Sequence, residues 1–380
     1  MSALFFAVMR VVHLSARAAD PDRRTILRAV AATGVDLVAA VPERWLDDAG
    51  DERRTGAGSD GGVRIVPVAV SSIEDEVGAT WHAGTVRQLL RDVRPDLVHV
   101  EREPWSPVAA TVLAAAKGLR IPVVLQAASP IAVPLSLVAR WRRRRVLRQL
   151  AGAIGTSTAA LALLRDELPE GRPVACIADR ATIVPPRLPT VAHDTFTIGF
   201  HGRLVPERGC DLLLRAVVKL YGPWQLRIAG TGPSQEELET LAQRLGIAAR
   251  VEWLGGLPSD RRDAFWSSLD VLVAPSRTTP DWVEPAGLLL RDAMARGIAV
   301  AGTRSGALPD VIGDAGALVA EEDPAALAEV LQGLAEDAEG LAAVREAGRK
   351  RVMGRFTAEA VAEGLLEMWK SVSTTRVETT

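Results

Sequence analysis

Two acidic residues and a glycine surround the start of one predicted helix. Glu284 precedes Gly287, and Asp292 follows inside the helix expected over 287–296. The first N–H groups of a helix have no intrahelical acceptor, and the helix dipole favours an anion there. The segment 278–295 is therefore suited to a phosphorylated sugar donor, with a carboxylate on each side of the helix start.

A glycine-rich run in the same half of the chain carries positive charge. The run 197–209 places Gly202, Arg203 and Arg208 after an apolar, strand-like stretch. Guanidinium groups suit phosphate oxygens because they donate hydrogen bonds in a planar fork. The run does not match a P-loop, and the first strand carries no G-x-G-x-x-G of a dinucleotide-binding enzyme. Taken alone, the run could equally be an ordinary strand-to-helix turn with surface arginines.

Short apolar runs alternate with helical patterns along the chain. Most of the apolar runs are continuous, as expected for parallel strands that are buried on both faces. This alternation predicts an α/β fold with two Rossmann-like domains facing across a cleft. The predicted strands are 11–14, 36–41, 63–68, 97–100, 123–125 and 152–155 in the first half, and 196–200, 224–229, 250–254, 271–274, 299–301 and 317–319 in the second.

Length and composition also favour two domains. A chain of 380 residues is long for one core, and 48% hydrophobic with 24% charged residues is typical of a globular protein. The proline-rich segment 184–194 is the best predicted linker. The expected domains are 1–187 and 188–357, and a C-terminal helix in 358–380 is expected to pack back on the first domain.

Charge and cysteine content exclude several classes of function and of stabilising site. A net charge of −2 gives no reason to expect nucleic acid as a partner. Cys176 and Cys210 are too few and too far apart for a disulfide framework or a zinc site, which favours free thiols in a reducing cytoplasm. The apolar run 3–14 is shorter than the ~20 residues of a membrane-spanning helix, so a buried strand is expected. Met9 would make a good protein start, with 1–8 as an upstream extension.

Several glycine-rich runs stand together in the second half. They are GRLVPERG from Gly202, IAGTGP from Ile228, VEWLGGLP from Val251, DVLVAPSRTTPDWVEPAGLLLRDAMARG from Asp270 and GTRSGALPDVIGDAGALV from Gly302. In order and spacing, they resemble the donor domain of retaining GT-B glycosyltransferases of family 4. The first-half runs RPDLVHVEREPWS, PVVLQ and AIGTSTAAL resemble the family less specifically. The resemblance covers almost the whole chain and implies sugar transfer from a nucleotide diphosphate sugar to a hydroxyl acceptor, with retention.

The resemblance assigns roles to residues of the second half. It places Arg203 and Arg208 on the donor diphosphate, Glu284 by the sugar hydroxyls and Asp292 on the ribose hydroxyls. Arg208 stands where the family has Lys, and Asp292 stands where it has Glu. The residues expected to be catalytic are thus Glu284, Arg203 and Arg208. The expected donor-binding residues are Gly202, Gly230, Gly232, Leu257, Pro285, Ala286, Gly287, Leu288 and Asp292.

No cofactor or metal is expected to be required. No Asp-x-Asp motif stands at a strand end, so the arginines and the helix start at Gly287 are expected to neutralise the departing diphosphate. UDP-sugars are the commonest donors of the family and are favoured on that basis. The acceptor is expected to be a small molecule, a glycan or a lipid-linked molecule, and no dedicated base is assigned.

The first half departs from the family pattern where the acceptor is expected. The loop after the first strand contains Ser15 but no glycine, and 126–129 lacks the His of many members. Glu101 is an alternative to Glu103 for orienting an acceptor hydroxyl, and solvated loop charges are the plain alternative to both. The predicted acceptor residues are Ser15, Glu103, Trp105 and Gln126. Three histidines at strand ends are expected to be structural: His13, His99 and His201.

These departures leave two other functions open. One is a catalytically silent GT-B protein that binds a nucleotide sugar or a partner. The other is a nucleotide-sugar epimerase, for which the necessary acid and base residues are not evident in the sequence. Turnover in a panel of nucleotide sugars separates them from a transferase.

Two charged segments have roles that the sequence leaves open. The helix expected over 134–150 contains four successive arginines, 142–145, which suit an anionic membrane surface, an anionic acceptor or plain solvation. A cytoplasmic protein is expected, with peripheral contact to the inner membrane face as an alternative. The charged, glycine-rich segment 48–62 is predicted to be a surface loop, with an acceptor lid as the alternative.

Overall fold

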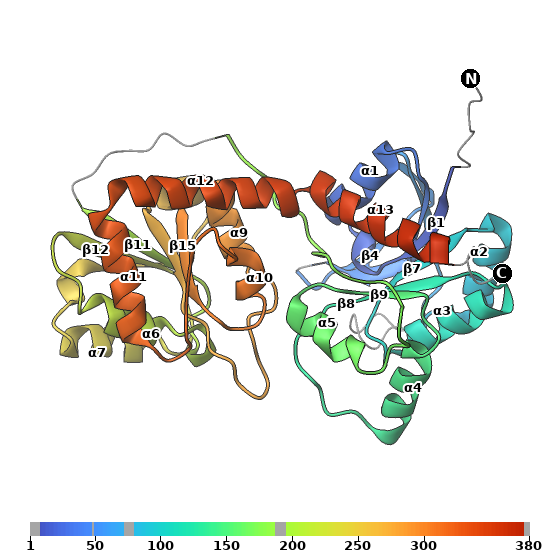
Figure 1. Cartoon of the computed structure of the whole chain (residues 1–380), viewed down its shortest axis with the longest axis horizontal. Helices are drawn as coiled ribbons and strands as arrows, with labels where there is room; N and C mark the ends of the chain where they lie inside the picture. Colours follow the sequence, from blue (N-terminus) through green and yellow to red (C-terminus); the bar gives the residue numbers. More distant parts are fainter. Residues whose placement is uncertain (1–7, 48, 72–79, 187–194, 376–380) are drawn as a thin grey trace. The chain divides into compact units, whose positions relative to one another are not determined.

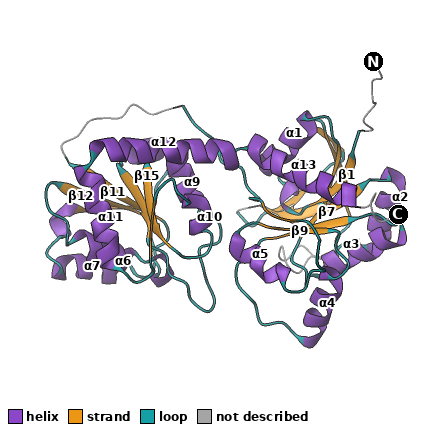
Figure 2. Cartoon of the chain, in the orientation of Figure 1, coloured by secondary structure: helices purple, strands orange, loops and turns teal. Residues whose placement is uncertain are grey.

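The computed structural model describes residues 8–47, 49–71, 80–186 and 195–375 (Figure 1). The chain divides into two compact units, Met1–Ala181 with Ala358–Thr380, and Thr182–Thr357. Each unit is a mainly parallel sheet with helices on both faces (Figure 2), which confirms the predicted pair of Rossmann-like α/β domains. The domain boundary expected at 187 and most of the predicted linker lie outside the described residues.

The first unit is built on eight strands in the order β10-β9-β8-β7-β1-β2-β6-β5. All pairs are parallel except β5 with β6. The strands are β1 (Arg10–Leu14), β2 (Asp36–Pro42), β5 (Gly58–Asp60), β6 (Val63–Val68), β7 (Leu97–Glu101), β8 (Val123–Ala127), β9 (Gly152–Gly155) and β10 (Val174–Cys176). The helices are α1 (Thr25–Ala32), α2 (Ala83–Val93), α3 (Pro107–Gly118), α4 (Leu137–Leu147), α5 (Thr158–Arg165) and α13 (Ala358–Thr375).

Alternating side chains of this sheet belong to two separate cores. Val12 and Leu14 of β1 pack in the core that includes α2 and α3, whereas Val11 packs in the core that includes α1 and α13. Successive strand residues point to opposite faces, so continuous apolar strands need cover on both sides. The C-terminal helix α13 supplies part of that cover through Leu365 and Trp369, both of which are buried.

The second unit is built on six parallel strands in the order β13-β12-β11-β14-β15-β16. The strands are β11 (Phe196–His201), β12 (Trp224–Ala229), β13 (Val251–Gly255), β14 (Val271–Ala274), β15 (Ala299–Thr303) and β16 (Ala317–Val319). The helices are α6 (Cys210–Val217), α7 (Gln235–Arg244), α8 (Ser259–Ser267), α9 (Leu288–Ala295), α10 (Leu308–Ile312), α11 (Pro324–Glu336) and α12 (Ala338–Arg355). Every predicted strand of this half is present within two residues of its predicted ends.

Each sheet reverses its strand order once. In the first unit the chain runs from β1 outward to β6 and then returns to β7 on the other side of β1. In the second unit it runs from β11 to β13 and returns to β14 beside β11. Ligands of open α/β sheets bind outside the carboxyl ends of the strands at such a reversal. Ligand-binding residues are therefore expected in the loops after β1 and β7 and in those after β11 and β14.

The prediction that 48–62 is a plain surface loop is wrong. It contains β4 (Glu52–Arg54), which pairs antiparallel with β3 (Arg44–Leu46), and it contains β5 at the edge of the main sheet. These strands escape detection because β4 is exposed and charged and β5 consists of Gly, Ser and Asp, so no apolar alternation marks either strand. An ion pair between Arg53 and Asp47 holds the β3–β4 ribbon, and Arg28 binds Asp60 of β5.

The helices α4 and α1 begin two or three residues later than predicted, and a side-chain cap accounts for the start of α4. The hydroxyl oxygen of Ser136 accepts from the backbone N–H of Ala139 at 3.3 Å, so α4 starts at Leu137 and not at 134. Before α1 the chain makes two short 3-10 turns, 17–19 and 21–23. Among the described helices, none is both long and apolar enough to cross a membrane.

Candidate active site

Close backbone approaches bring the strand-end loops of the second unit together. A Cβ atom on Gly230 would lie 1.8 Å from the carbonyl oxygen of Gly202, so the loops after β11 and β12 touch through glycine. A Cβ atom on Gly306 would lie 2.1 Å from the carbonyl oxygen of Glu284, so the loops after β14 and β15 touch in the same way. Only glycine permits such approaches, because every other residue carries a Cβ atom.

Glu284 and Arg208 form an ion pair at the reversal between β11 and β14. The guanidinium Nη1 of Arg208 lies 2.5 Å from Oε2 of Glu284, although the residues are 76 positions apart. Ser276 Oγ donates to the same carboxylate at 3.3 Å, and the Gly287 backbone N–H donates to Oε1 at 3.3 Å. The structure thus brings together two of the three residues predicted to be catalytic, with Glu284 buried.

The start of α9 differs in detail from its prediction. The helix begins at Leu288, and Gly287 is its N-cap with a left-handed backbone, φ 56°. The Gly287 N–H is not a free donor in this structure, because Glu284 accepts from it. A ligand anion that accepts from the Gly287 N–H would therefore have to share it with the Glu284 carboxylate or replace that carboxylate.

The other predicted donor residues line the same edge of the sheet or stand near it. Arg203 is exposed in the loop after β11. Asp292 is half-buried in α9, where burial raises the pKa of its carboxyl, although Arg296 and Arg291 act in the opposite sense. The remaining predicted donor residues lie in loops or at the start of α9, and they range from exposed to buried. They are Gly202, Gly230, Gly232, Leu257, Pro285, Ala286, Gly287 and Leu288.

Two residues that sequence reasoning did not select also contact this pair. Trp282 lies under the guanidinium of Arg208, with 5.1 Å from the Arg208 Cζ to the ring centroid. Ser276 contacts Glu284 from the turn that ends β14. Both precede Glu284 in the quoted run that starts at Asp270, so only their side-chain directions were beyond the sequence.

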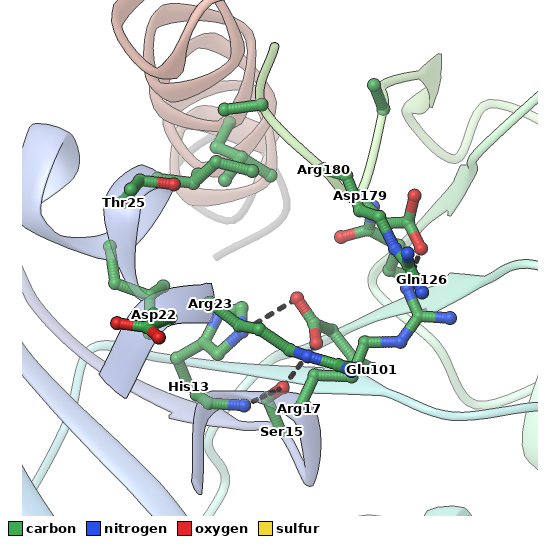
Figure 3. A pocket seen from close by; sticks show the side chains of 16 residues that line it. His13, Ser15, Arg17, Asp22, Arg23, Thr25, Glu101, Gln126, Asp179 and Arg180 are labelled. Atoms are coloured by element: carbon green, nitrogen blue, oxygen red, sulfur yellow. Dashed lines mark hydrogen bonds and ion pairs between the residues drawn. The ribbon is translucent and has the colours of Figure 1, made fainter. Parts of the chain in front are cut away.

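A cavity of about 270 Å³ lies in the first unit at the reversal between β1 and β7 (Figure 3). Its polar floor joins these two strands. His13 Nε2 lies 3.0 Å from Oε1 of Glu101, and the Ser15 hydroxyl donates to Oε2 at 2.5 Å. In Figure 3 dashed lines join the Glu101 carboxylate to His13 and to Ser15. Glu101, kept above as an alternative to Glu103, is thus the acidic group at the centre of this cavity.

Electrostatics keep the Glu101 carboxylate ionised. Burial alone would raise its pKa, but His13 through its charge and its hydrogen bond, together with His99 and Ser15, lowers the pKa far below the ordinary range. His99 lies behind this pair, with its ring centroid 4.5 Å from that of His13. Burial first, and then His13, lower the pKa of His99 to about 3, so His99 is neutral at pH 7.

Charged residues surround the cavity opening. Arg17 forms an ion pair with Asp179, and Arg23 forms one with Asp20. Arg180 also lines the cavity. Polar side chains on opposite sides of a small cavity suit a ligand with several hydroxyl groups, because carboxylates accept from hydroxyls and guanidinium groups donate to them.

The predicted acceptor residues do not all meet. Ser15 and Gln126 line this cavity, and Gln126 Nε2 donates to the carbonyl oxygen of Ile177 at 3.3 Å. The carboxylate of Glu103 accepts from the backbone N–H groups of Ala128 and Ser129, in a neighbouring pocket.

Glu103 and Trp105, both predicted to bind the acceptor, thus lie outside this cavity. Burial raises the pKa of Glu103, while those two backbone hydrogen bonds lower it in part. Trp105 lies in a separate groove beside α4. His201, expected to be structural, packs edge-on against Phe265 and Trp266.

Two such Rossmann-like units in one chain agree with the GT-B fold of glycosyltransferases. Solved structures share this fold over nearly the whole chain. Sucrose-phosphate synthase from Thermosynechococcus elongatus matches with a TM-score of 0.65 and 18% identity, covering 97% of this chain and 100% of that one. Anabaena HepE in complex with UDP matches with a TM-score of 0.64 and 15% identity, covering 96% and 100%.

Family models narrow the class. The model for glycosyl transferases group 1 matches residues 189–351, and the model for the glycosyl transferase 4-like domain matches residues 21–179. The chain therefore belongs to the GT-B glycosyltransferases of the family 4 type, as its motifs indicated.

Curated relatives match over shorter stretches. A GDP-mannose-dependent alpha-(1-6)-phosphatidylinositol monomannoside mannosyltransferase of Mycolicibacterium smegmatis is 34% identical over 39% of this chain and 40% of its own length. A D-inositol 3-phosphate glycosyltransferase of Corynebacterium jeikeium is 31% identical over 51% and 48%. The 2-deoxystreptamine glucosyltransferase of Streptomyces kanamyceticus is 27% identical over 68% and 72%. The aligned region thus spans about half or less of the length of the first two relatives.

Proposed function

We propose that this chain transfers a sugar from a nucleotide diphosphate sugar to a hydroxyl acceptor, with retention at the anomeric carbon. The Arg208–Glu284 pair is the observation that carries the proposal. In such a donor the sugar ring is bonded to the second phosphate, so the groups that bind the phosphates and the sugar hydroxyls must be neighbours. A guanidinium and a carboxylate in direct contact at a strand-order reversal meet that requirement.

Charge stabilisation of the leaving diphosphate is the chemistry assigned to the second unit. Arg208 would exchange part of its contact with Glu284 for phosphate oxygens, and Arg203 would add a second cation from the same loop. Donors placed in advance where negative charge develops can supply a large part of a rate enhancement. Asp292 would hold the ribose. We propose a UDP-sugar as donor and no requirement for a metal; the first-named relative uses GDP-mannose, so the base itself needs testing.

We assign binding of the acceptor to the first unit. Its cavity has an ionised carboxylate, Glu101, held by His13 and Ser15. An acceptor hydroxyl that donates to Glu101 would be oriented, and its oxygen would become more nucleophilic. The acceptor class comprises small molecules, glycans and lipid-linked molecules; named relatives span a phosphatidylinositol mannoside and 2-deoxystreptamine. Cys176 and Cys210 form no disulfide with each other in the described part of the chain, and a cytoplasmic site of action is part of this proposal.

The test uses the whole chain and a panel of UDP-, GDP- and ADP-sugars. Thermal shifts identify the nucleotide, since a bound ligand raises the apparent stability by mass action. Release of nucleoside diphosphate is then followed with and without candidate acceptors and with a chelator present. Proton NMR of the product gives the anomeric configuration. Transfer with retention supports the proposal, whereas tight binding without turnover by any acceptor or by water would assign the silent function.

A further inference from the structure

Large apolar side chains are exposed together at one place in the first unit. Leu137 is 82% exposed, Val138 63% and Trp141 61%, and all three stand in the first turns of α4. Val133, in the loop that leads to α4, is 37% exposed. Soluble proteins expose single apolar residues routinely, but a contiguous group of this kind marks a contact surface.

The same side of α4 carries arginines. At 100° per residue the exposed positions of this helix fall within about half of its circumference, and the buried positions Val146 and Leu147 fall outside that half. We call this side the basic–apolar face. It consists of Leu137, Val138, Arg140, Trp141, Arg144, Arg145 and Arg148, with Arg145 lying over the Trp141 ring at 5.2 Å.

Other arginines of the run hold the helix in place. Arg142 Nη1 donates to the carbonyl oxygen of Trp105 at 2.9 Å. Arg143 binds Glu167 and the carbonyl oxygen of Leu163. The four successive arginines therefore divide into two that anchor α4 and two, Arg144 and Arg145, that contribute to the exposed face, although Arg144 also lies 3.9 Å from Glu167.

A groove extends the face toward the body of the unit. Its lining includes Trp105, Ile131, Val133, Leu135 and Leu163, together with α4 residues. In Figure 1, α4 projects at the lower end of the first unit, beyond the other helices of that unit. The side chains of Leu137, Val138 and Trp141 on this helix are exposed to solvent.

We propose that the basic–apolar face docks the chain on an anionic lipid bilayer. Leu137, Val138 and Trp141 would enter the headgroup region, and the arginines would bind lipid phosphates. Tryptophan suits this depth because its ring is apolar and its N–H is polar. Guanidinium groups are attracted by the surface potential of anionic lipids. Each α4 residue with an ionisable side chain is an arginine, so no carboxylate of the helix opposes that attraction. Docking is independent of the transfer reaction proposed above.

Co-sedimentation of the full chain with lipid vesicles tests this inference. Vesicles of equal parts phosphatidylcholine and phosphatidylglycerol should bind the chain, and vesicles of phosphatidylcholine alone should bind it at least tenfold more weakly, because roughly four exposed arginines contribute. Binding should weaken as salt rises, since salt screens charges at the surface. Equal binding to both vesicles, or binding to neither, overturns the inference.

Variants locate the contact. Arg144→Glu with Arg145→Glu should lower the affinity for anionic vesicles by about tenfold or more. Leu137→Ser with Trp141→Ser should also weaken it, with less change in salt dependence. Exposed residues of the second unit provide matched controls, namely Arg215→Glu with Lys219→Glu, and Tyr221→Ser, which should bind as the parent does.

Two further measurements keep the outcome unambiguous. Circular dichroism and thermal melting should be unchanged in every variant, because the substituted side chains are exposed. Light scattering without vesicles reports self-association. A dimer that the Leu137→Ser, Trp141→Ser variant dissociates, together with absent vesicle binding, would assign the face to a second copy of the chain and overturn docking on lipid.

Discussion

The two units share one architecture and place different chemistry at the same topological position. At the reversal of the second sheet, Arg208 and Glu284 pair among loops that approach one another through glycine. At the reversal of the first sheet, Glu101 binds His13 and Ser15 in a cavity whose first loop, 15–21, contains no glycine. The edge of the second sheet is formed by loops in close backbone contact, whereas the edge of the first sheet is formed by side chains around a cavity.

This difference separates two kinds of recognition. Backbone N–H groups and glycine loops suit phosphates, which are the same in every nucleotide sugar. Side chains around a cavity suit an acceptor, whose shape varies from enzyme to enzyme. The proposed donor edge carries the motif runs that resemble the family, whereas the proposed acceptor edge departs from the family pattern. Changes at the two edges should have separable effects on catalysis, and four predictions test that separation.

The largest effect is expected at the donor edge. Arg208→Ala should lower kcat/KM by roughly 10²–10³, because it removes a cation aimed at the developing diphosphate charge. Donor hydrolysis should fall with transfer, since both break the same bond. Steady-state rates with saturating acceptor measure the effect, and Arg215→Ala, an exposed arginine of the same unit, is the control. Parent-like rates would remove Arg208 from the site.

At the acceptor edge, Glu101→Gln should reduce transfer by roughly 10–100-fold, since hydrogen bonds to a charged group contribute about 1.5–3 kcal/mol. The donor KM and the rate of donor hydrolysis should stay within about twofold of the parent, because no donor contact is assigned to Glu101. Nucleotide release with and without acceptor gives both rates from one preparation. A parallel loss of hydrolysis would mean that the two edges are not separable.

Replacing the glycine at the close backbone approach should impair only the donor edge of the second unit. Gly230→Ala places a Cβ atom 1.8 Å from the carbonyl oxygen of Gly202. We expect it to destabilise the second unit by about 1–3 kcal/mol, as overpacking usually does, and to weaken the thermal shift produced by nucleotide. Gly256→Ala is the matched substitution, because a Cβ there meets nothing within 4 Å. Equal melting of both variants would contradict a close approach between these loops.

The last prediction is a pH dependence of stability that is confined to the first unit. His99 has its pKa lowered to about 3 when folded, against 6.5 for an ordinary His. Below pH 6.5 the unfolded chain binds more protons, so stability is lost as pH falls toward 3, by at most about 1.4 kcal/mol per pH unit. The lowered pKa of Glu101 acts in the same direction at lower pH.

Thermal melting between pH 7 and pH 4 checks this. His99→Phe keeps an aromatic ring in the core and should flatten the acid dependence, while His82→Asn, at an exposed position, should leave it as in the parent. An unchanged slope in His99→Phe would show that other groups set the acid stability of the first unit.

Local patterns in the sequence determined most of the fold. Continuous apolar runs and glycine-rich turns predicted the strands of both sheets, because burial on two faces demands apolar side chains at successive positions. They missed β3, β4, β5 and β10, each only three residues long, and β4 and β5 contain no apolar side chain. The donor motifs were equally visible, since the loop that holds a phosphate is short and contiguous in sequence.

Only the tertiary structure decided which distant side chains meet. The order of strands places β1 beside β7, so His13 reaches Glu101 across 88 positions, while Glu103 binds two backbone N–H groups and Trp105 lies in another groove. The packing of α4 likewise decided which arginines anchor the helix and which are exposed. Periodicity marks the faces of a helix, but the neighbour that covers one face is set by contacts between residues far apart in the chain.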